Sequence, residues 1–174
     1  RSASVDVSRA EIEGACAALV GDSLQTPPAY SAVKVGGRKL YQAARKGDAL
    51  EAPARRIRVD AFEVSAFDGR DVEVRITCSG GTYVRVLVAD VGRALGCGAH
   101  LEELRRTRIG PFAIEEASTL DTLSGLAFQR RLHESLLSPA DLLRELPRVS
   151  VSADAAMLLA HGRDVPEGAW GPPS

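Results

Sequence analysis

The feature that most constrains the fold of this 174-residue chain is a pair of alternating segments joined by a tight-turn signal. From Arg56 to Cys78, polar and apolar residues alternate with the period of two that is typical of half-buried β-strands. The phase of the alternation shifts by one residue at Phe62, as a β-bulge would produce. Asp68-Gly69 is a strong hairpin-turn dipeptide. The sequence therefore predicts an antiparallel hairpin.

Helical patterns flank the predicted hairpin on both sides. Ser8 and Glu11 have capping-box spacing and are followed by an apolar face, so we expect a helix over residues 8–20. After the hairpin, Thr82 can cap a helix whose apolar residues recur at helical spacing until Gly96. Shorter elements are expected as well: a strand at 30–35 with a Gly36-Gly37 turn, helices at 40–46 and around Leu101 and Leu104, a strand at 109–114 interrupted by Gly110-Pro111, helical pieces over 119–146, and one strand and one helix after Pro147.

Composition and charge exclude several classes of protein. Apolar residues make up 45% of the chain and charged residues 26%, which is typical of a folded domain. The net charge of -1 argues against a uniformly basic nucleic-acid binder, although basic residues can still cluster locally. The cysteines and histidines lack metal-site spacing, so we expect reduced thiols, with Cys16 in the core, and no metal. Because the sequence has no membrane-span pattern and no signal-peptide pattern, we expect a soluble cytoplasmic protein.

The stretch CSGGTYVR, residues 78–85, is the first candidate site. Its two glycines separate the end of a strand from the first turn of a helix, where free main-chain N–H groups can bind an anion. Arg85 places a positive charge at the positive end of the helix dipole, so a carboxylate or phosphate partner is expected. These residues alone leave an alternative open, in which the glycines form a simple turn, Arg85 pairs with a surface acid and Tyr83 packs on the core.

Two long segments carry a more specific signal. They are QTPPAYSAVKVGGRKLYQAARKG, residues 25–47, and CSGGTYVRVLVADVGRALGCGAHLEELRRTRIGPF, residues 78–112. In sequence, order and spacing, these segments resemble the bacterial TruB family of tRNA pseudouridine-55 synthases. The resemblance covers residues 8–120 and weakens beyond them. It implies an α+β fold with a mixed, mostly antiparallel sheet flanked by helices, followed by the beginning of a small β-rich domain.

The family resemblance implies an isomerase that acts on tRNA. Such an enzyme would convert uridine 55 in the T loop to pseudouridine by breaking the C1'–N1 glycosidic bond and rejoining the base through C5. The resemblance implies no cofactor and no metal. Because the reacting atoms are inaccessible inside a folded RNA loop, the base must first flip into a pocket of the enzyme. The expected partner is the T arm and T loop of tRNA, and a monomer is expected.

The resemblance also assigns roles to individual residues. Tyr83 is similar to the family tyrosine that lines the pocket beside the flipped base, and Arg85 is similar to the arginine that pairs with the catalytic aspartate. Leu104 is similar to the residue that forms the apolar wall of the pocket. The first segment resembles the part of the family that lies beside the RNA groove, where phosphates or sugars would contact Tyr30, Lys34, Lys39 and Arg45. By residue type alone, a cluster of lysine and arginine also fits a solvated face.

The sequence departs from the family at the catalytic aspartate. The family carries this residue in a G-x-L-D-P-x-A-T-G motif, which does not occur in the 174 residues. Asp90 follows Arg85 on the same predicted helix, but an acid there is better explained by hydrogen bonds from neighbouring arginines. We therefore expect residues 1–147 to be a catalytic domain without its aspartate segment, and residues 148–174 to begin a PUA-like RNA-binding domain. The chain by itself is predicted to be inactive.

Two other functional classes remain open from the sequence. One is a non-catalytic tRNA-binding or RNA-remodelling module that keeps the groove for tRNA and has lost the catalytic segment. The other is a structural or protein-interaction domain in which the motifs are only turns, and this class predicts no pocket between Tyr83 and Leu104. We favour the enzyme, because a binding module would be expected to begin at a domain boundary, whereas this sequence resembles the family from mid-domain onwards.

Overall fold

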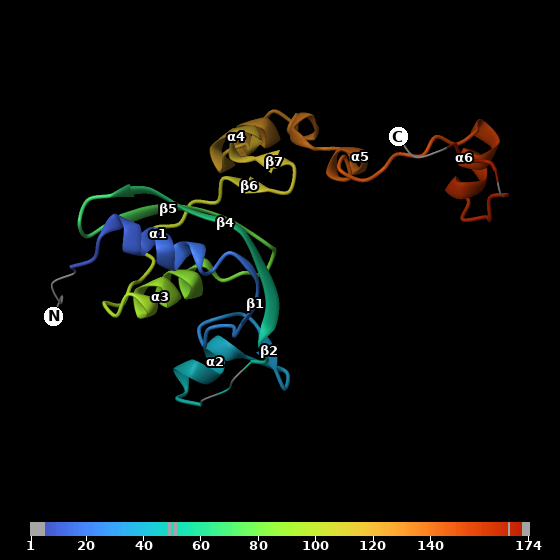
Figure 1. Ribbon diagram of the computed structural model, residues 1–174. Coiled ribbons are helices and arrows are strands. Elements are labelled where there is room, and N and C mark those ends of the chain that lie inside the picture. The colour runs from blue at the N-terminus through green and yellow to red at the C-terminus, as the bar shows by residue number, and fades with distance from the viewer. Residues whose placement is uncertain (1–5, 49, 51, 167, 172–174) are drawn as a thin grey trace. The chain divides into compact units, whose positions relative to one another are not determined.

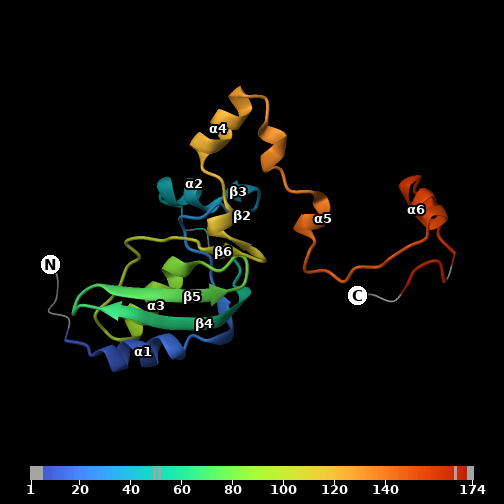
Figure 2. The same ribbon diagram turned by 90° about the horizontal axis from the view of Figure 1, so that it is seen from above.

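The structure is a computed structural model that describes residues 6–48, 50, 52–166 and 168–171. The chain forms two compact units, Arg1–Leu104 and Arg105–Ser174. Figure 1 labels elements of both units, and Figure 2, a second view after a turn of 90°, also labels β3. The first unit contains a three-stranded sheet, and the second contains a short hairpin and several short helices.

An antiparallel sheet forms the centre of the first unit. Its strands, in spatial order, are β1 (Gly21–Gln25), β4 (Arg55–Phe67) and β5 (Val72–Cys78). The predicted hairpin is confirmed as β4 and β5. The register of this pair shifts between Val59 and Ala61 and again between Val64 and Ala66. The phase change predicted at Phe62 lies between these two irregularities of β4.

The turn between β4 and β5 forms around Asp68, as predicted. Its carboxylate accepts hydrogen bonds from the main-chain N–H groups of Asp71 (2.8 Å) and Arg70 (3.0 Å). These two bonds stabilise the ionised form and lower the pKa of the Asp68 carboxyl. Gly69 has a φ of 98°, which favours glycine. The turn thereby fixes the register with which β5 returns along β4.

Strand β1 was not predicted from the sequence. Its residues, GDSLQ, include glycine, aspartate and serine, which have low intrinsic β propensity. The segment is a strand because it pairs with β4, from Gly21 opposite Val59 to Gln25 opposite Arg55. Tertiary pairing therefore overrides local preference at this edge of the sheet.

Two helices cover one face of the sheet. α1 (Arg9–Ala17) and α3 (Val84–Ala94) lie on the same side of it (Figure 1). The predicted capping box of α1 is confirmed, because the Ser8 hydroxyl accepts from the Glu11 N–H and the Glu11 carboxylate accepts from the Ser8 N–H. The helix ends at Ala17, earlier than predicted.

The core of the first unit lies between these helices and the sheet. It consists of Ile12, Cys16, Ile57, Val59, Phe62, Leu87 and Val91. Burial of each large apolar side chain stabilises the fold by about 1.5–3 kcal/mol. Cys16 is in the core, as predicted, and burial raises the pKa of its thiol.

A short hairpin and a helix follow β1. They are β2 (Lys34–Val35), β3 (Arg38–Lys39) and α2 (Leu40–Arg45). The turn predicted at Gly36-Gly37 is confirmed, and both residues have positive φ, 57° and 78°. The strand predicted over 30–35 is wrong before residue 34. The carbonyls of Ser31 and Val33 accept hydrogen bonds from the first main-chain N–H groups of α2 (3.1 and 2.8 Å), and so do not join a strand ladder.

The short helix predicted around Leu101 and Leu104 is wrong. Residues 98–107 form no regular element, and Leu104 is 63% exposed. The main-chain N–H of Gly98 donates to the carbonyl of Gly92 (2.9 Å), so the chain folds back on α3. Two leucines among charged residues offer too little burial to offset the cost of nucleating a single helical turn.

The second unit begins with a hairpin. β6 (Arg108–Ile109) pairs with β7 (Phe112–Ala113), and Gly110-Pro111 is the turn between them. The single strand predicted over 109–114 is therefore wrong, because Gly110, with a φ of 52°, helps to reverse the chain. A 3₁₀ turn, η1 (Ile114–Glu116), follows directly.

The rest of the second unit is built from short helices. The pieces predicted over 119–146 are confirmed as α4 (Leu120–Phe128), η2 (Leu132–Ser135) and α5 (Pro139–Leu142). The predicted later helix is confirmed as α6 (Ala153–Ala160). The strand predicted before it is reduced to one bridge pair, Val151 with Trp170.

We predict that Gly92 is a position of α3 that tolerates no side chain. An added Cβ would lie 2.1 Å from the main-chain nitrogen of Ala99 and 2.3 Å from the carbonyl carbon of Gly98. Gly92→Ala should therefore lower the free energy of unfolding by about 1–3 kcal/mol, measured by urea denaturation. Gly14→Ala in α1 is the matched control, because among the described residues nothing beyond the neighbouring helix backbone lies within 4 Å of its added Cβ. It should raise this free energy by about 0.5–1 kcal/mol. Equal effects would contradict the close approach of residues 98–99 to α3.

Candidate functional site

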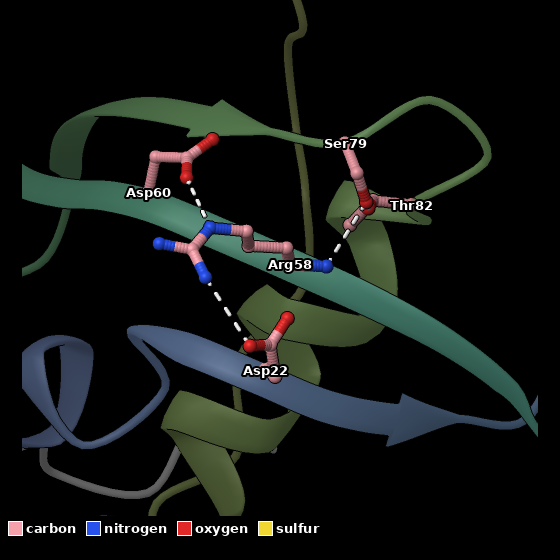
Figure 3. A network of polar contacts seen from close by, with 5 residues as sticks. All are labelled: Asp22, Arg58, Asp60, Ser79 and Thr82. Carbon is pink, nitrogen blue, oxygen red and sulfur yellow. Dashed lines mark hydrogen bonds and ion pairs between the residues drawn. The ribbon is translucent and has the colours of Figure 1, made fainter.

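Ser79 fixes the start of the corner between β5 and α3. Its main-chain N–H donates to the carbonyl of Arg58 (2.8 Å), and the Arg58 main-chain N–H donates to the Ser79 hydroxyl (2.9 Å). Figure 3 shows the bond from the Arg58 main-chain N–H to the Ser79 hydroxyl, beyond the end of β5. The hydroxyl oxygen of Thr82 is 3.2 Å from that of Ser79. Ser79 thus extends the β4–β5 ladder, with its side chain in place of a main-chain acceptor. Gly81, with a φ of 84°, then turns the chain toward α3.

Gln25 fixes the end of the corner to β1. Its carboxamide oxygen accepts from the main-chain N–H of Tyr83 (2.8 Å), and its carboxamide nitrogen donates to the Tyr83 carbonyl (3.2 Å). Tyr83, not the predicted Thr82, is the N-cap residue of α3, because its carbonyl accepts the first helical hydrogen bonds, from the N–H groups of Val86 (2.9 Å) and Leu87 (3.3 Å). The Thr82 hydroxyl is instead 3.2 Å from that of Ser79. Gln25 was not among the site residues predicted from the sequence. The only signal was its place at the head of the first family-like segment.

Arg85 reaches from α3 to the segment after β1. Its guanidinium donates to the main-chain carbonyl of Tyr30 (2.7 Å) and lies 5.6 Å from the centre of the Tyr83 ring. The structure therefore brings together three of the predicted site residues, Tyr30, Tyr83 and Arg85. Within the described ranges, Arg85 forms no ion pair, so its charge is not neutralised by an acid. Tyr83 is half-buried, whereas Arg85 and Tyr30 are exposed, Tyr30 at 63%.

Arg58 differs from Arg85 because two carboxylates surround it. The Arg58 guanidinium donates to Asp60 (2.7 Å) on the same strand and to Asp22 (3.2 Å) on β1 (Figure 3). The hydrogen bond to Asp60 and the charge of Asp22 raise the pKa of the Arg58 guanidinium. All three side chains are about half-exposed or more, so these ion pairs stabilise the fold little. Their main consequence is that Arg58 is not free to bind an anion.

The predicted basic residues of the first segment lie on the β2–β3 hairpin and on α2. Lys34 is directly opposite Lys39 in the register of the hairpin. Lys39 and Arg45 each lie over the ring of Tyr41, 5.7 and 5.6 Å from its centre. Like charges directly opposite one another are unfavourable in a sheet. This arrangement would therefore be favoured by a bound anion.

Leu104, a predicted pocket residue, and Asp90, the acid on the same helix as Arg85, are two further residues discussed from the sequence. Leu104 belongs to the irregular segment after α3 and is exposed. Asp90 accepts a hydrogen bond from Arg93 (2.5 Å), one turn along α3. This contact confirms that Asp90 pairs with a neighbouring arginine.

In the part of the chain that the structure describes, no helix is long and apolar enough to cross a membrane. The same residues contain no group of three histidine, cysteine or acidic side chains that could hold a metal ion. The corner between β5 and α3 offers main-chain groups, aromatic rings and a cationic side chain.

Two family models match consecutive parts of the chain. Residues 1–84 match the TruB family pseudouridylate synthase N-terminal domain. Residues 85–148 match the tRNA pseudouridylate synthase B C-terminal domain. The boundary between the two matches falls inside the corner, between Tyr83 and Arg85.

Curated relatives match almost the whole chain. The chain is 47% identical over 163 residues to the tRNA pseudouridine synthase B of Aromatoleum aromaticum, covering 93% of this chain and 52% of that protein. It is 43% identical over 169 residues to the protein of the same name in Burkholderia lata, covering 97% and 52%. The chain thus spans about half the length of the curated relatives it matches.

Solved structures of two complexes contain chains with a similar fold. A chain of a Cbf5-Nop10-Gar1 complex matches with a TM-score of 0.71 and 32% identity, over 91% of this chain and 46% of that one. A chain of an H/ACA RNP bound to a substrate RNA containing 2'-deoxyuridine matches with a TM-score of 0.69 and 28% identity, over 92% and 44%.

The hydroxyl of Ser79 should matter more to stability than an exposed serine on the same sheet. Ser79→Ala leaves the main-chain N–H of Arg58 without its protein acceptor, so we expect the free energy of unfolding to fall by about 1–2 kcal/mol. Ser65→Ala is the matched control, because its exposed hydroxyl makes one hydrogen bond, to the Glu73 carbonyl. Its effect should stay within about 0.5 kcal/mol. Denaturation curves that give Ser79→Ala the same small effect would contradict an anchoring role for this hydroxyl.

Proposed function

Since the chain belongs to the TruB family of pseudouridylate synthases, we propose that the protein converts uridine 55 in the T loop of tRNA to pseudouridine. The observation that carries this proposal is the position of Arg85 between the Tyr30 carbonyl and the Tyr83 ring. In the reaction, the C1'–N1 bond breaks and a C1'–C5 bond forms, while C5 loses a proton and N1 gains one. Substrate and product have the same atoms, so no net oxidation or reduction occurs.

Arg85 is proposed to hold the catalytic carboxylate. One of its N–H groups donates to the Tyr30 carbonyl, and the described residues leave other donors of the guanidinium available. A planar guanidinium can bind a carboxylate through two parallel hydrogen bonds, which fixes both the distance and the orientation of the acid. Contact with the Tyr83 ring further limits the rotation of the Arg85 side chain. The site therefore suits a carboxylate that must attack or deprotonate from one defined direction.

The carboxylate is proposed to come from polypeptide outside these 174 residues. The aspartate motif of the family does not occur in them, and Asp90 is bonded to Arg93. Residues 1–174 alone are accordingly proposed to be inactive. The complete enzyme is proposed to act as a monomer in the cytoplasm.

The flipped uracil is proposed to lie between aromatic and apolar side chains. The Tyr30 side chain is exposed and that of Tyr83 is half-buried. Arg85 contacts both residues, through its hydrogen bond to the Tyr30 carbonyl and its position over the Tyr83 ring. Exposed aromatic rings are the usual platforms on which unpaired RNA bases stack. Leu104 is proposed to supply the apolar wall of the pocket in the presence of tRNA, since most of its side chain is available for contact.

The RNA backbone is proposed to bind the β2–β3 hairpin and α2. Lys34, Lys39 and Arg45 gather positive charge on these two elements, although the chain as a whole has a net charge of -1. A phosphate would relieve the repulsion between the facing lysines. Such contacts would be largely independent of base sequence and sensitive to salt, which suits an enzyme that recognises one arm of many tRNAs.

The domain division is also a proposal. Residues 1–147 are assigned to the catalytic domain, and residues 148–174 to the start of a PUA-like domain. The second family model supports this division, because its match ends at residue 148. The division into compact units, after Leu104, lies inside the proposed catalytic domain.

Arg85→Ala is predicted to abolish turnover without abolishing tRNA binding. In the full-length gene product, kcat should fall about 100-fold or more, because the carboxylate loses the group that orients it. The dissociation constant for tRNA should change by less than about threefold, since phosphate contacts elsewhere dominate affinity. Turnover is measured by tritium release from tRNA labelled at C5 of uridine.

The matched control for this variant is Arg93→Ala. Arg93 lies on the same helix, is 76% exposed and pairs with Asp90, so its removal should leave kcat unchanged. Normal turnover in Arg85→Ala would remove Arg85 from the mechanism.

Lys34 and Lys39 are predicted to control the salt dependence of tRNA binding. Each change to glutamine should reduce the slope of log affinity against log salt by about 0.7–1 if it removes one phosphate contact. Arg70→Gln is the control, because Arg70 lies in the distant β4–β5 turn, where its main-chain N–H bonds Asp68. Binding is measured by filter retention at several salt concentrations. If the Lys34 and Lys39 variants have the same salt slope as the unsubstituted protein and Arg70→Gln, the RNA backbone does not contact these two lysines.

A further inference from the structure

Gln25 has an unusual environment for a polar side chain. It is the last residue of β1, is 6% exposed, and forms both of its described side-chain hydrogen bonds with the main chain of Tyr83. A buried carboxamide must satisfy both its donor and its acceptor, or it destabilises the fold. In this structure, the main chain of Tyr83 bonds both the nitrogen and the oxygen of the Gln25 carboxamide. The Gln25 side chain therefore joins the end of β1 to the start of α3 by two hydrogen bonds, although the two residues are 58 positions apart.

No other side chain in the described ranges performs this task for Tyr83. Tyr83 is the N-cap residue of α3, yet its own side chain caps nothing, and the neighbouring Thr82 hydroxyl is bonded to Ser79. The Tyr83 main-chain N–H donates to Gln25. The position at which α3 begins is thus set from β1, and Arg85 lies in the first turn of that helix.

The segment that begins at Gln25 also contacts Arg85. Tyr30, the last residue of this short segment, accepts the Arg85 hydrogen bond (2.7 Å) on its main-chain carbonyl. Between them lies Thr26-Pro27-Pro28-Ala29, in which two prolines have fixed φ angles and Pro27 is buried. Residues 25–30 therefore form a segment with restricted backbone angles, which contacts Tyr83 at its first residue and Arg85 at its last.

We infer that Gln25 is a positioning residue for catalysis, which sets the places of Tyr83 and Arg85 through the Tyr83 main chain. This inference rests on the proposed synthase function. It assigns Gln25 no contact with the substrate. A displacement of α3 would move the Tyr83 ring and the Arg85 guanidinium together, and a shift of about 1 Å in a positioned group can reduce turnover about 100-fold.

Two substitutions of similar size test the inference in the full-length gene product. Gln25→Glu keeps an acceptor for the Tyr83 N–H but places a second carboxylate oxygen against the Tyr83 carbonyl, where a donor is required. Gln25→Met keeps the length and bulk of the side chain and removes both hydrogen bonds. We expect kcat to fall about 10- to 100-fold in both variants. The dissociation constant for unmodified tRNA should change by less than about threefold, because the phosphate contacts remain.

Gln129→Glu and Gln129→Met are the matched controls. Gln129 is exposed in the second unit, and its described side-chain hydrogen bond is with Arg131. Both control variants should keep the kcat of the unsubstituted protein. The fraction of folded protein is measured by urea denaturation in parallel, so that kcat refers to folded enzyme.

The outcomes separate this inference from the function on which it rests. If the unsubstituted full-length product releases no tritium from C5-labelled tRNA, the proposed function is wrong. If that product is active and a folded Gln25→Met variant has normal kcat, only the role of Gln25 is overturned. Loss of the folded state in both Gln25 variants, or a fall in tRNA affinity as large as the fall in kcat, would assign Gln25 to structure alone and also overturn it.

Discussion

Hydrogen bonds to the main chain of a glycine corner are the interaction on which the rest of the site depends. Gly80 and Gly81 have no side chains with which to pack, so residues 79–82 would have many conformations of similar energy without external contacts. Ser79 ties one end of the corner to β4, and Gln25 ties Tyr83 to β1. Each bond contributes only about 1 kcal/mol to stability, but together they fix where α3 begins. The place of every side chain in the first turn of α3 follows from that.

Arg58 and Arg85, which both lie near this corner, differ in the groups to which their guanidinium N–H groups donate. Arg58 donates to two carboxylates, so its charge is neutralised within the fold. Arg85 donates to a neutral carbonyl and keeps its positive charge at the helix end where the dipole disfavours it. Among the residues that the structure describes, no acid pairs with this guanidinium, which is held by a carbonyl and an aromatic ring and can bind an anion from elsewhere. This difference makes Arg85, and not Arg58, the residue around which the proposed chemistry is arranged.

Strong periodicity and turn chemistry allowed much of the fold to be predicted, and tertiary contacts explain the errors. The hairpin over 56–78 was predictable because alternation, turn and phase change all agree along one segment. Strand β1 was not, because its residues are poor strand formers and only pairing with β4 makes them a strand. The family-like motifs indicated Tyr83 and Arg85, and these roles remain predictions. Gln25 could not be identified from sequence, since its importance lies in a contact with a residue 58 positions away. The expected cap at Thr82 was wrong because the first helical acceptor is the Tyr83 carbonyl, one residue later, and the Thr82 hydroxyl lies against Ser79.

The proposed synthase function is tested most directly by position-resolved detection of pseudouridine in an unmodified tRNA transcript after incubation with the full-length gene product. Chemical labelling of pseudouridine followed by primer extension gives the position of each converted uridine. The proposed isomerisation should give one new pseudouridine, at position 55, formed without any added cofactor. Tight binding of the transcript with no conversion at any uridine would contradict it and would favour a protein that binds or remodels tRNA.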